Sequence, residues 1–397
     1  ITSHLTSMTT THPSLSASAP TDDRDTKRAR HDNSTRTTSL SLGASFLTPE
    51  QKCELEATAA HICTTGKGIS ACDESAGTIG KRFEAVGIEN TEENRRIYRQ
   101  MLFKTEDCEQ YLSAVILDPE TLYQRDDENV LFPQVLQSKG IIPGIKPHLK
   151  VYTLPGTNGD TVMQGLDSLA ARAREYYKAG ARFAKWRSPI TIPATDLAIQ
   201  ANMNDLARYA LICQSEGLMP IVEPDVSLSG AHTLEEAVDV NVRVQSTLFK
   251  AMIDHGVHMA GCTLKSNIVN PGKDCHVSYS VEDIAAANLH VLQQCFPVAM
   301  KGVNFLSGGQ SLKQAAARLA AINEIKGNAA APWNISFSWS AAIQLPLLEL
   351  CRGHGELQLE KMSKLYRAEL EIACAAATGL WHDGSLERSD GDHVGKQ

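Results

Sequence analysis

The 397-residue sequence has no run of 18 consecutive apolar residues, and this absence excludes a conventional membrane-spanning helix. It has no excess of positive charge either, since 38 Lys and Arg oppose 46 Asp and Glu, for a net charge of -8. An acidic chain suits the phosphate backbone of nucleic acid poorly, so neither nucleic acid nor a membrane is expected as a partner. The overall composition of the sequence, 42% hydrophobic and 21% charged residues, is that of a globular protein with a substantial core.

Motifs for metals and nucleotides are also missing. The ten cysteines form no Cys-x-x-Cys pair, which indicates reduced thiols in an intracellular protein. Among the 13 histidines, His255 and His258 are three residues apart, but no third ligand follows at a suitable spacing. The Gly66-Lys67-Gly68 turn lacks the pattern of a phosphate loop. We therefore predict neither a metal nor a cofactor.

The first 45 residues differ from the rest of the chain. They contain 19 Ser or Thr and no aromatic residue, a composition that cannot offset the entropy lost on ordering. We predict a disordered leader over 1–45, with Met8 as a candidate start, a folded part over 46–380 and a flexible tail over 381–397. The expected compartment is the cytoplasm, and targeting by the leader to a plastid or another organelle stays open.

The folded part alternates between apolar and helical segments. Capping motifs mark helix starts at Thr48-Pro49-Glu50-Gln51 and, as we predict, at Asn90. Compact apolar runs predict eight buried strands, which start near residues 69, 114, 141, 183, 219, 261, 303 and 335. Strands that alternate with helices at such spacings predict an α/β protein with a parallel sheet.

Eight strand–helix units that close on themselves form a (β/α)₈ TIM barrel, here as a single domain. The alternative is a doubly wound open sheet. That fold is expected to have a glycine-rich nucleotide turn after its first strand, and Cys72-Asp73-Glu74-Ser75 is not such a turn. The sequence therefore favours the barrel.

Polar and charged residues close the predicted strands, in the order Asp73, Lys146, Lys185 with Arg187, Glu223, Lys265 and Ser307-Gly308-Gly309. In a (β/α)₈ barrel these ends meet at one face, where active sites lie. A single lysine there would need no explanation beyond an ammonium that reaches solvent. Three lysines and two acids at five strand ends predict one shared site.

This combination suits carbonyl chemistry. A lysine amine adds to a carbonyl and forms an iminium, for which it must be partly neutral, and burial or a second cation lowers its pKa. Lys185 and Lys265 are candidates for such a pair. Glu223 is a candidate proton shuttle and Asp73 a candidate acceptor of a hydroxyl proton. The Ser307–Gly309 turn suits phosphate, although alone it would equally be a simple helix entry.

Seven motifs match one family in order: Ala71-Cys72-Asp73-Glu74-Ser75-Ala76-Gly77-Thr78-Ile79-Gly80-Lys81-Arg82, Thr91-Glu92-Glu93-Asn94-Arg95-Arg96, Pro143-Gly144-Ile145-Lys146, Phe183-Ala184-Lys185-Trp186-Arg187, Pro220-Ile221-Val222-Glu223-Pro224, Leu264-Lys265-Ser266-Asn267 and Phe305-Leu306-Ser307-Gly308-Gly309-Gln310. On these motifs the sequence resembles class I fructose-bisphosphate aldolase, the metal-independent Schiff-base kind, from about Leu47 to Leu380. The resemblance implies reversible cleavage of fructose 1,6-bisphosphate to dihydroxyacetone phosphate and glyceraldehyde 3-phosphate, and commonly a homotetramer.

The resemblance also implies roles for single residues. Lys265 matches the Schiff-base lysine, Glu223 the general acid/base of imine formation, and Asp73 the carboxylate that handles the C4 hydroxyl proton. Lys185 matches the lysine that tunes the nucleophile. Ser75, Arg82, Lys146 and Arg187 match contacts to the substrate or its 6-phosphate, and Ser307 and Gly308 match part of the 1-phosphate site.

The sequence departs from the family at several points. Where the family reads Phe-Ser-Tyr-Gly-Arg-Ala-Leu-Gln, Ala341 replaces the phosphate-binding Arg. After Lys146 the family's Val-Asp-Lys is replaced by Pro147-His148-Leu149, and Asp225 replaces a Glu. Many family members end in a Tyr that reaches into the site, whereas the last Tyr of this sequence is Tyr366. Two hypotheses stay open: a working lyase with or without altered phosphate selectivity, and a catalytically impaired aldolase-like binding or scaffold protein. We predict the lyase, because every position for covalent chemistry and proton transfer is retained.

Overall fold

The computed structural model describes residues 46–327 and 329–382. The prediction of a disordered leader over 1–45, with Met8 as a candidate start, lies outside the described residues, as does the predicted tail over 381–397 except for its first two residues. Among the described helices, none is long and apolar enough to cross a membrane.

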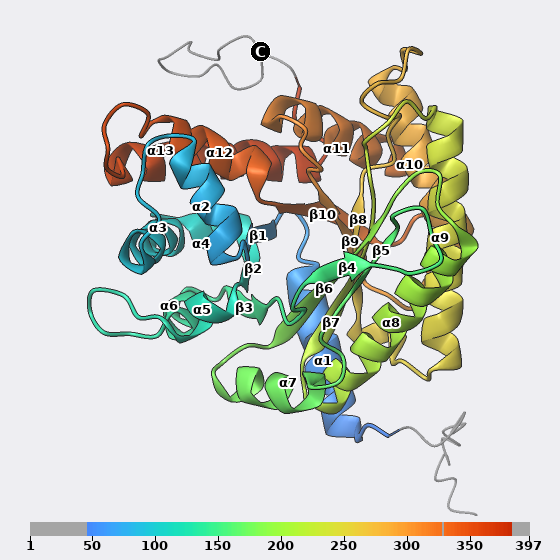
Figure 1. The fold of residues 1–397 in the computed structure, drawn as a ribbon, viewed down its shortest axis with the longest axis horizontal. Helices are drawn as coiled ribbons and strands as arrows, with labels where there is room; N and C mark the ends of the chain where they lie inside the picture. Colours follow the sequence, from blue (N-terminus) through green and yellow to red (C-terminus); the bar gives the residue numbers. More distant parts are fainter. Residues whose placement is uncertain (1–45, 328, 383–397) are drawn as a thin grey trace, which may run out of the picture. The chain divides into compact units, whose positions relative to one another are not determined.

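Within the described residues, eight parallel strands close into a barrel (Figure 1). The strands are β1 (Gly68–Cys72), β2 (Leu112–Leu117), β3 (Ile142–Ile145), β6 (Phe183–Ile190), β7 (Met219–Val226), β8 (Thr263–Asn267), β9 (Gly302–Leu306) and β10 (Asn334–Trp339). Closure is direct, because β1 pairs in parallel with β2 on one side and with β10 on the other. The prediction of a (β/α)₈ barrel is confirmed, and the open-sheet alternative is wrong.

Helices surround the barrel (Figure 1). They are α1 (Pro49–Ile62), α2 (Ala76–Glu84), α3 (Glu92–Lys104), α4 (Cys108–Tyr111), α5 (Pro119–Tyr123), α6 (Phe132–Ser138), α7 (Leu169–Lys178), α8 (Asp196–Ser215), α9 (Leu234–Asp254), α10 (Val281–Cys295), α11 (Leu312–Lys326), α12 (Ala341–Glu349) and α13 (Leu359–Ala377), with a short 3₁₀ turn, η1 (Met259–Gly261). Because they cover the outer face of the sheet, the strands are buried on both faces, as apolar runs of this kind require.

The interior of the barrel is closed at the amino-terminal ends of the strands by α1. Leu55, Ala59 and Ile62 of this helix form one buried cluster with residues at the starts of the strands, among them Phe183 and Met219. A larger cluster fills the space between the sheet and the outer helices. With one end filled by side chains, only the carboxyl ends of the strands remain open to a ligand.

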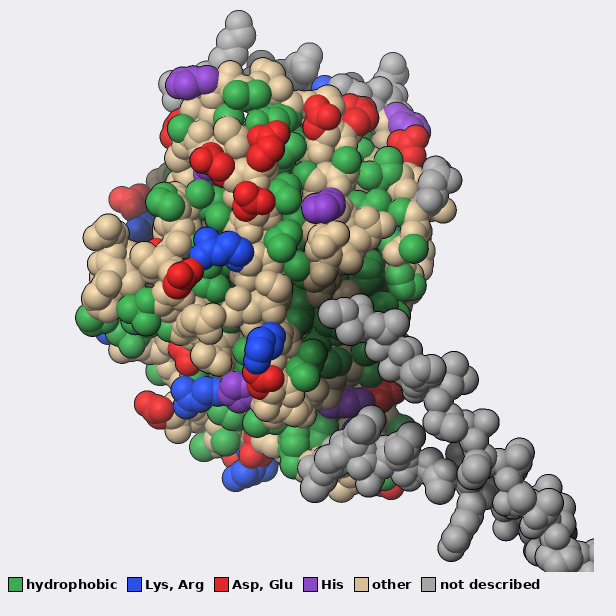
Figure 2. All heavy atoms as spheres, turned by 90° about the vertical axis from the view of Figure 1, so that its right-hand side faces the viewer, with side chains coloured by type: hydrophobic (Ala, Val, Ile, Leu, Met, Phe, Trp, Pro, Cys, Tyr) green, Lys and Arg blue, Asp and Glu red, His purple; other side chains and the backbone are tan. Residues whose placement is uncertain are grey.

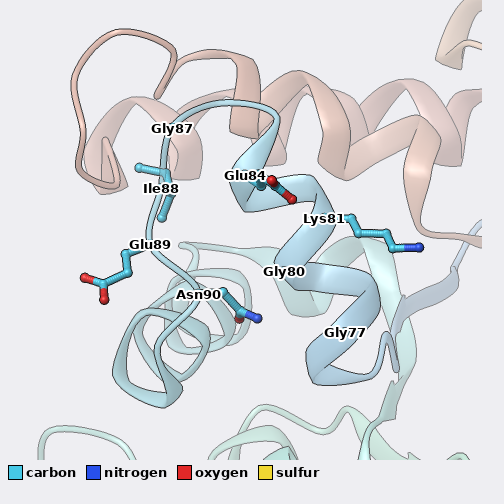
Figure 3. Close-up of a pocket in the computed structure, with 8 residues that line it drawn as sticks. All are labelled: Gly77, Gly80, Lys81, Glu84, Gly87, Ile88, Glu89 and Asn90. Carbon is cyan, nitrogen blue, oxygen red and sulfur yellow. The ribbon is translucent and has the colours of Figure 1, made fainter.

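The region between β1 and β2 differs from the prediction. The nine-residue helix α2 was not predicted, because Gly77 and Gly80 lower the helix propensity of its sequence. Its packing requires one of them: a Cβ on Gly80 would lie 2.3 Å from Nδ2 of Asn90, which Figure 3 shows beside the helix. The predicted helix start at Asn90 is wrong, because Thr91 caps α3 by accepting a hydrogen bond from the N–H of Asn94 (3.0 Å).

A two-stranded antiparallel hairpin, β4 (Val151–Thr153) with β5 (Thr161–Met163), is inserted between β3 and β6. The sequence did not predict it, because strands of three residues give too little periodic pattern. The buried carboxylate of Asp160 fixes the hairpin by accepting hydrogen bonds from the hydroxyls of Thr191 (2.7 Å) and Thr195 (2.6 Å).

Candidate active site

The residues predicted from strand ends are carried to one end of the barrel. Asp73 follows β1 and Lys146 follows β3, while Lys185, Glu223 and Lys265 lie within β6, β7 and β8. The parallel register places neighbouring strand ends at the same level, with Lys185 opposite Ile221 and Arg187 opposite Glu223. Since the strands all run the same way, side chains from five of them meet in one cup.

Two lysines in this cup are bridged by carboxylates. Nζ of Lys185 lies 2.8 Å from Oδ2 of Asp73 and 3.0 Å from Oε2 of Glu223. Nζ of Lys265 lies 3.4 Å from Oε1 of the same glutamate. The side chains of both lysines and of Glu223 are buried. Glu223 therefore lies between the two ammonium groups, with one carboxylate oxygen toward each.

The two lysines have opposite pKa shifts. Burial lowers the pKa of Lys265 below its usual value, and the positive charge of Lys185 lowers it further, although Glu223 opposes both. Burial would also lower the pKa of Lys185, but the charges of Asp73 and Glu223 outweigh it and raise that pKa. Lys185 therefore remains an ammonium, and Lys265 is the amine that loses its proton more readily.

Both carboxylates of the cup stay ionised. Burial would raise the pKa of Asp73, but the charges of Lys185, Lys265 and Lys146 hold it well below its usual value. The pKa of Glu223 is likewise lowered by Lys185 and Lys265 against the effect of burial. An ionised carboxylate that is held by lysines can accept a proton from a bound hydroxyl.

The sequence missed one carboxylate of this site. Lys146 donates a hydrogen bond to Oδ2 of Asp118 (2.8 Å) and another to the backbone oxygen of Asp73 (2.6 Å). Asp118 directly follows β2, and this position is the same signal that selects the other strand-end residues.

The predicted substrate-binding arginines are held in ion pairs. NH1 of Arg82 lies 2.9 Å from Oε1 of Glu74, and both NH1 and NH2 lie 3.1 Å from Oγ of Ser340. NH2 of Arg99 lies 2.7 Å from the other oxygen of Glu74. The predicted Ser75 is the N-cap of α2, accepting from the N–H of Thr78.

Arg187 has a similar partner. Its Nε lies 2.6 Å from Oδ2 of Asp225, the residue that replaces the family's glutamate. Burial raises the pKa of Asp225, with the charge of Arg187 opposing that rise. Because of the ion pair with Arg187, Asp225 serves as an acidic partner at a position where the family has a glutamate.

His148 belongs to the site although the sequence marked it only as a departure. Its Nδ1 lies 3.5 Å from the backbone N of Arg187, and its ring packs edge-on against Trp186 with centroids 5.8 Å apart. Burial and the charges of Lys185 and Lys146 hold its pKa well below its usual value. The imidazole is neutral at pH 7 and leaves the cup without a further charge at this point.

The Ser307–Gly309 turn joins β9 to α11. Gly308 and Gly309 have φ values of +57° and +79°, which favour glycine. The side chain of Gln310 donates to the carbonyl of Ser307 (2.9 Å) and so braces the turn. Ala341 begins α12, directly after Ser340. The turn after β9 is therefore formed, and the position next along the barrel lacks the arginine of the family.

Metal ligands do not gather within 46–327 and 329–382, where no group of three or more His, Cys, Asp or Glu side chains is placed to hold an ion. His255 and His258, weighed as a metal pair, have other partners. Nδ1 of His255 lies 2.8 Å from the carbonyl of Ala251, and Nε2 of His258 lies 2.7 Å from Oε1 of Glu56.

A closed (β/α)₈ barrel with a buried lysine pair bridged by carboxylates at its open end is the arrangement of a lyase that works through a lysine Schiff base. Comparison with known proteins agrees. The family model "Fructose-bisphosphate aldolase class-I" matches residues 54–394. The chain belongs to the class I fructose-bisphosphate aldolase family.

Individual relatives cover most of the chain. The sequence is 45% identical to "Fructose-bisphosphate aldolase 4, cytosolic" of Arabidopsis thaliana over 82% of this chain and 83% of that protein. It is 46% identical to "Fructose-bisphosphate aldolase C-A" of Danio rerio over 85% and 96%. The Plasmodium falciparum aldolase, solved in complex with TRAP and a small-molecule inhibitor, superposes with a TM-score of 0.81 at 38% identity, over 85% and 98%. These relatives support the enzyme and do not favour an impaired scaffold protein.

Proposed function

We propose that this aldolase cleaves fructose 1,6-bisphosphate through a Schiff base on Lys265. The observation that carries the assignment is the position of Glu223, which lies between Lys265 and Lys185 in a buried cup. Of the two lysines, Lys265 has the lowered pKa, so it is the one that supplies a neutral amine.

In the first step the neutral amine of Lys265 attacks the C2 carbonyl and forms a carbinolamine. Glu223 takes a proton from the nitrogen and returns one to the hydroxyl, which leaves as water, and an iminium results. Lys185 keeps its own proton and holds Glu223 by charge. Its ammonium also disfavours a second positive charge on the free amine of Lys265.

In the second step the C3–C4 bond breaks. Asp73 accepts the C4 hydroxyl proton, the new C4 carbonyl leaves as glyceraldehyde 3-phosphate, and the electron pair of the broken bond moves into the iminium to give an enamine. Protonation of the enamine carbon and hydrolysis of the regenerated iminium release dihydroxyacetone phosphate. Asp73 is available for this role because neighbouring lysines keep its carboxylate ionised, and its Oδ2 is fixed 2.8 Å from Nζ of Lys185.

Substrate binding is assigned to the polar groups around this centre. The candidates for the substrate and its 6-phosphate are Ser75, Arg82, Lys146 and Arg187, and those for the 1-phosphate are Ser307 and Gly308. Support for the second pair comes from the positive φ of Gly308, which turns the backbone after β9 before α11 begins. The reaction as proposed needs no metal or cofactor.

We further propose a homotetramer in the cytoplasm. The tetramer rests on the family resemblance alone. The compartment is supported by the names of two relatives, the cytosolic aldolase 4 of Arabidopsis thaliana and the "cytoplasmic isozyme" of Spinacia oleracea, which is 43% identical.

Borohydride trapping tests the assignment. The protein is incubated with dihydroxyacetone phosphate, reduced with borohydride and mapped by mass spectrometry, with a Lys265→Met variant as control. We expect a reduced adduct on Lys265 that is lost in the variant. A wild-type protein without an adduct at Lys265 would overturn the proposal. Cleavage assays with fructose 1,6-bisphosphate and fructose 1-phosphate then measure phosphate selectivity.

A further inference from the structure

The phosphate turn after β9 has a cation beside it that the family resemblance does not assign. A Cβ placed on Gly309 would lie 3.4 Å from Nζ of Lys273. Lys273 lies in the segment that follows β8, the strand that carries Lys265. We propose that Lys273 binds the phosphate held at the Ser307–Gly309 turn and so sets the affinity for the C1-phosphate end of the substrate. This inference rests on the function proposed above for that turn.

The backbone that carries Lys273 is held firmly. The N–H of Lys273 donates to the carbonyl of Leu228 (2.9 Å), and the N–H of Asp274 donates to that of Gly230 (3.0 Å). The N–H of Gly272 donates to the carbonyl of His232 (2.8 Å). A Cβ on Gly272 would lie 2.1 Å from the carbonyl oxygen of Gly230, so no other residue fits there. The segments after β7 and β8 are thus joined over three consecutive residues.

The same two segments border the phosphate turn. A Cβ on Gly308 would lie 3.3 Å from Cδ1 of Leu228, just as one on Gly309 would lie beside Lys273. An apolar side chain and an ammonium therefore flank two successive residues of the turn. Because the joined segments fix the Cα of Lys273, only rotation of its side chain is needed to follow a bound phosphate.

The side chain of Lys273 is exposed, and among the residues that the structure describes its ammonium forms no ion pair or hydrogen bond. The other cations assigned to substrate are paired, Arg82 with Glu74 and Lys146 with Asp118. An unpaired ammonium beside a phosphate turn is free to form a charge-assisted hydrogen bond.

The replacement of the family's arginine by Ala341 increases the importance of Lys273 for phosphate binding. In the family an arginine at that position, at the end of the last barrel strand, contributes to phosphate binding, and here the position has no charge. Lys273 supplies a positive charge to the same turn from a different strand end, the one after β8. An ammonium is a point charge on a flexible stem, so it binds phosphate without the planar fork of an arginine.

The test compares Lys273→Met, Lys273→Arg and, as a matched control, Met in place of the exposed Lys361 on α13. Calorimetry measures the dissociation constant of dihydroxyacetone phosphate, and steady-state kinetics give KM for fructose 1,6-bisphosphate and fructose 1-phosphate. All three carry the phosphate of this turn. We expect Lys273→Met to weaken each about tenfold, the value for one hydrogen bond to a charged group. Lys273→Arg should restore most of the affinity, and Lys361→Met should change nothing.

Equal affinity of Lys273→Met and wild type for dihydroxyacetone phosphate, in protein that melts like wild type, would overturn the inference. So would a loss confined to fructose 1,6-bisphosphate, because Lys273 would then act at the 6-phosphate. Failure of the proposed function has a separate signature. The wild type would then lack the Lys265 adduct and cleavage, while calorimetry would still show whether Lys273 contributes to binding.

Discussion

At the scale of single residues, the cup separates two chemically identical side chains by their surroundings. Lys185 has two carboxylates within 3.0 Å and keeps its proton, whereas Lys265 has one carboxylate at 3.4 Å and a like charge nearby. The difference makes Lys265 the amine and Lys185 the fixed cation. Exchanging their surroundings, not their chemistry, would exchange their roles.

Replacement of Lys185 by Met tests this division. The charge of Lys185 lowers the pKa of Lys265, whereas the charge of Glu223 raises it. Lys185→Met removes only the lowering effect, so the pKa of Lys265 should rise. The rate of borohydride-trapped adduct formation should fall by roughly 10²-fold at pH 7, and its rise with pH should move to higher pH. A Lys185→Arg variant keeps the charge, so its rate of adduct formation should rise over nearly the same pH range as that of the wild type. If the rate of Lys185→Met also rose over the wild-type pH range, the assignment would be contradicted.

Single residues also mark the limit of prediction from sequence. Asp73, Lys185, Glu223 and Lys265 could be predicted because each comes at the end of an apolar run. Glu74 and Ser340 could not, because their roles come from the arginines they hold: Glu74 pairs with Arg82 and Arg99, and Ser340, which is distant in the sequence, bonds to Arg82. Lys273 could not be predicted either, because it does not end an apolar run. Its position depends on backbone hydrogen bonds to Leu228 and Gly230 that the sequence does not reveal.

At the scale of elements, strands were predicted more accurately than the segments between them. Buried strands such as β2 are continuous apolar runs, which local sequence reveals. The start of α3 depends instead on whether Asn90 or Thr91 caps it, and Asn90 is engaged by α2, donating to the carbonyl of Ala76 (3.1 Å). Tertiary contacts therefore decide the boundary that local pattern leaves open.

The two glycines of α2 give a matched pair of substitutions. Nothing lies within 4 Å of a Cβ on Gly77, so Gly77→Ala should stabilise the protein by about 0.5 kcal/mol through helix propensity. A Cβ on Gly80 would displace Asn90 and break its bond to Ala76, so Gly80→Ala should destabilise by about 1–2 kcal/mol. Urea unfolding of both variants measures the difference. Equal stability of the two would show that α2 does not pack on Asn90 as described.

At the scale of the whole molecule, the acidic balance is visible on the surface. On the face shown in Figure 2, acidic side chains gather in the upper part, where basic ones are sparse. The catalytic cup instead alternates lysines with carboxylates, since Lys185 contacts Asp73 and Glu223, and Glu223 also contacts Lys265. The sequence gives the net charge of -8, but only the fold separates the two regions.

Buried carboxylates make global stability depend on pH. The pKa values of Asp73, Glu223 and Glu74 are lowered in the folded state by neighbouring cations. Their contribution is therefore present above their unfolded pKa values of about 4 and is lost as pH falls through the folded ones. Asp225, whose pKa burial raises, opposes this trend.

We therefore expect the Tm to fall steeply below about pH 4, with a smaller fall in an Asp73→Asn variant. Lys185 acts at the other extreme. Its raised pKa contributes stability that is present below the unfolded value and is lost as pH rises through the folded one. Thermal melting followed by circular dichroism between pH 3 and 8 measures the expected fall of the Tm at low pH. A Tm that stays constant down to pH 3 would refute this prediction.

The seam between β1 and β10 has a consequence for synthesis of the chain. Of the eight barrel strands that the structure describes, β1 leaves the ribosome first and β10 last, and the barrel closes only where Ile69 meets Ser338 and Ser70 meets Trp339. Until then β1 has an unpaired edge, and Asp73, which follows it, has no fixed place opposite Lys185 and Glu223. The nascent protein therefore acquires its complete set of proton-transfer groups in one late event, when nearly the whole barrel is available to fold.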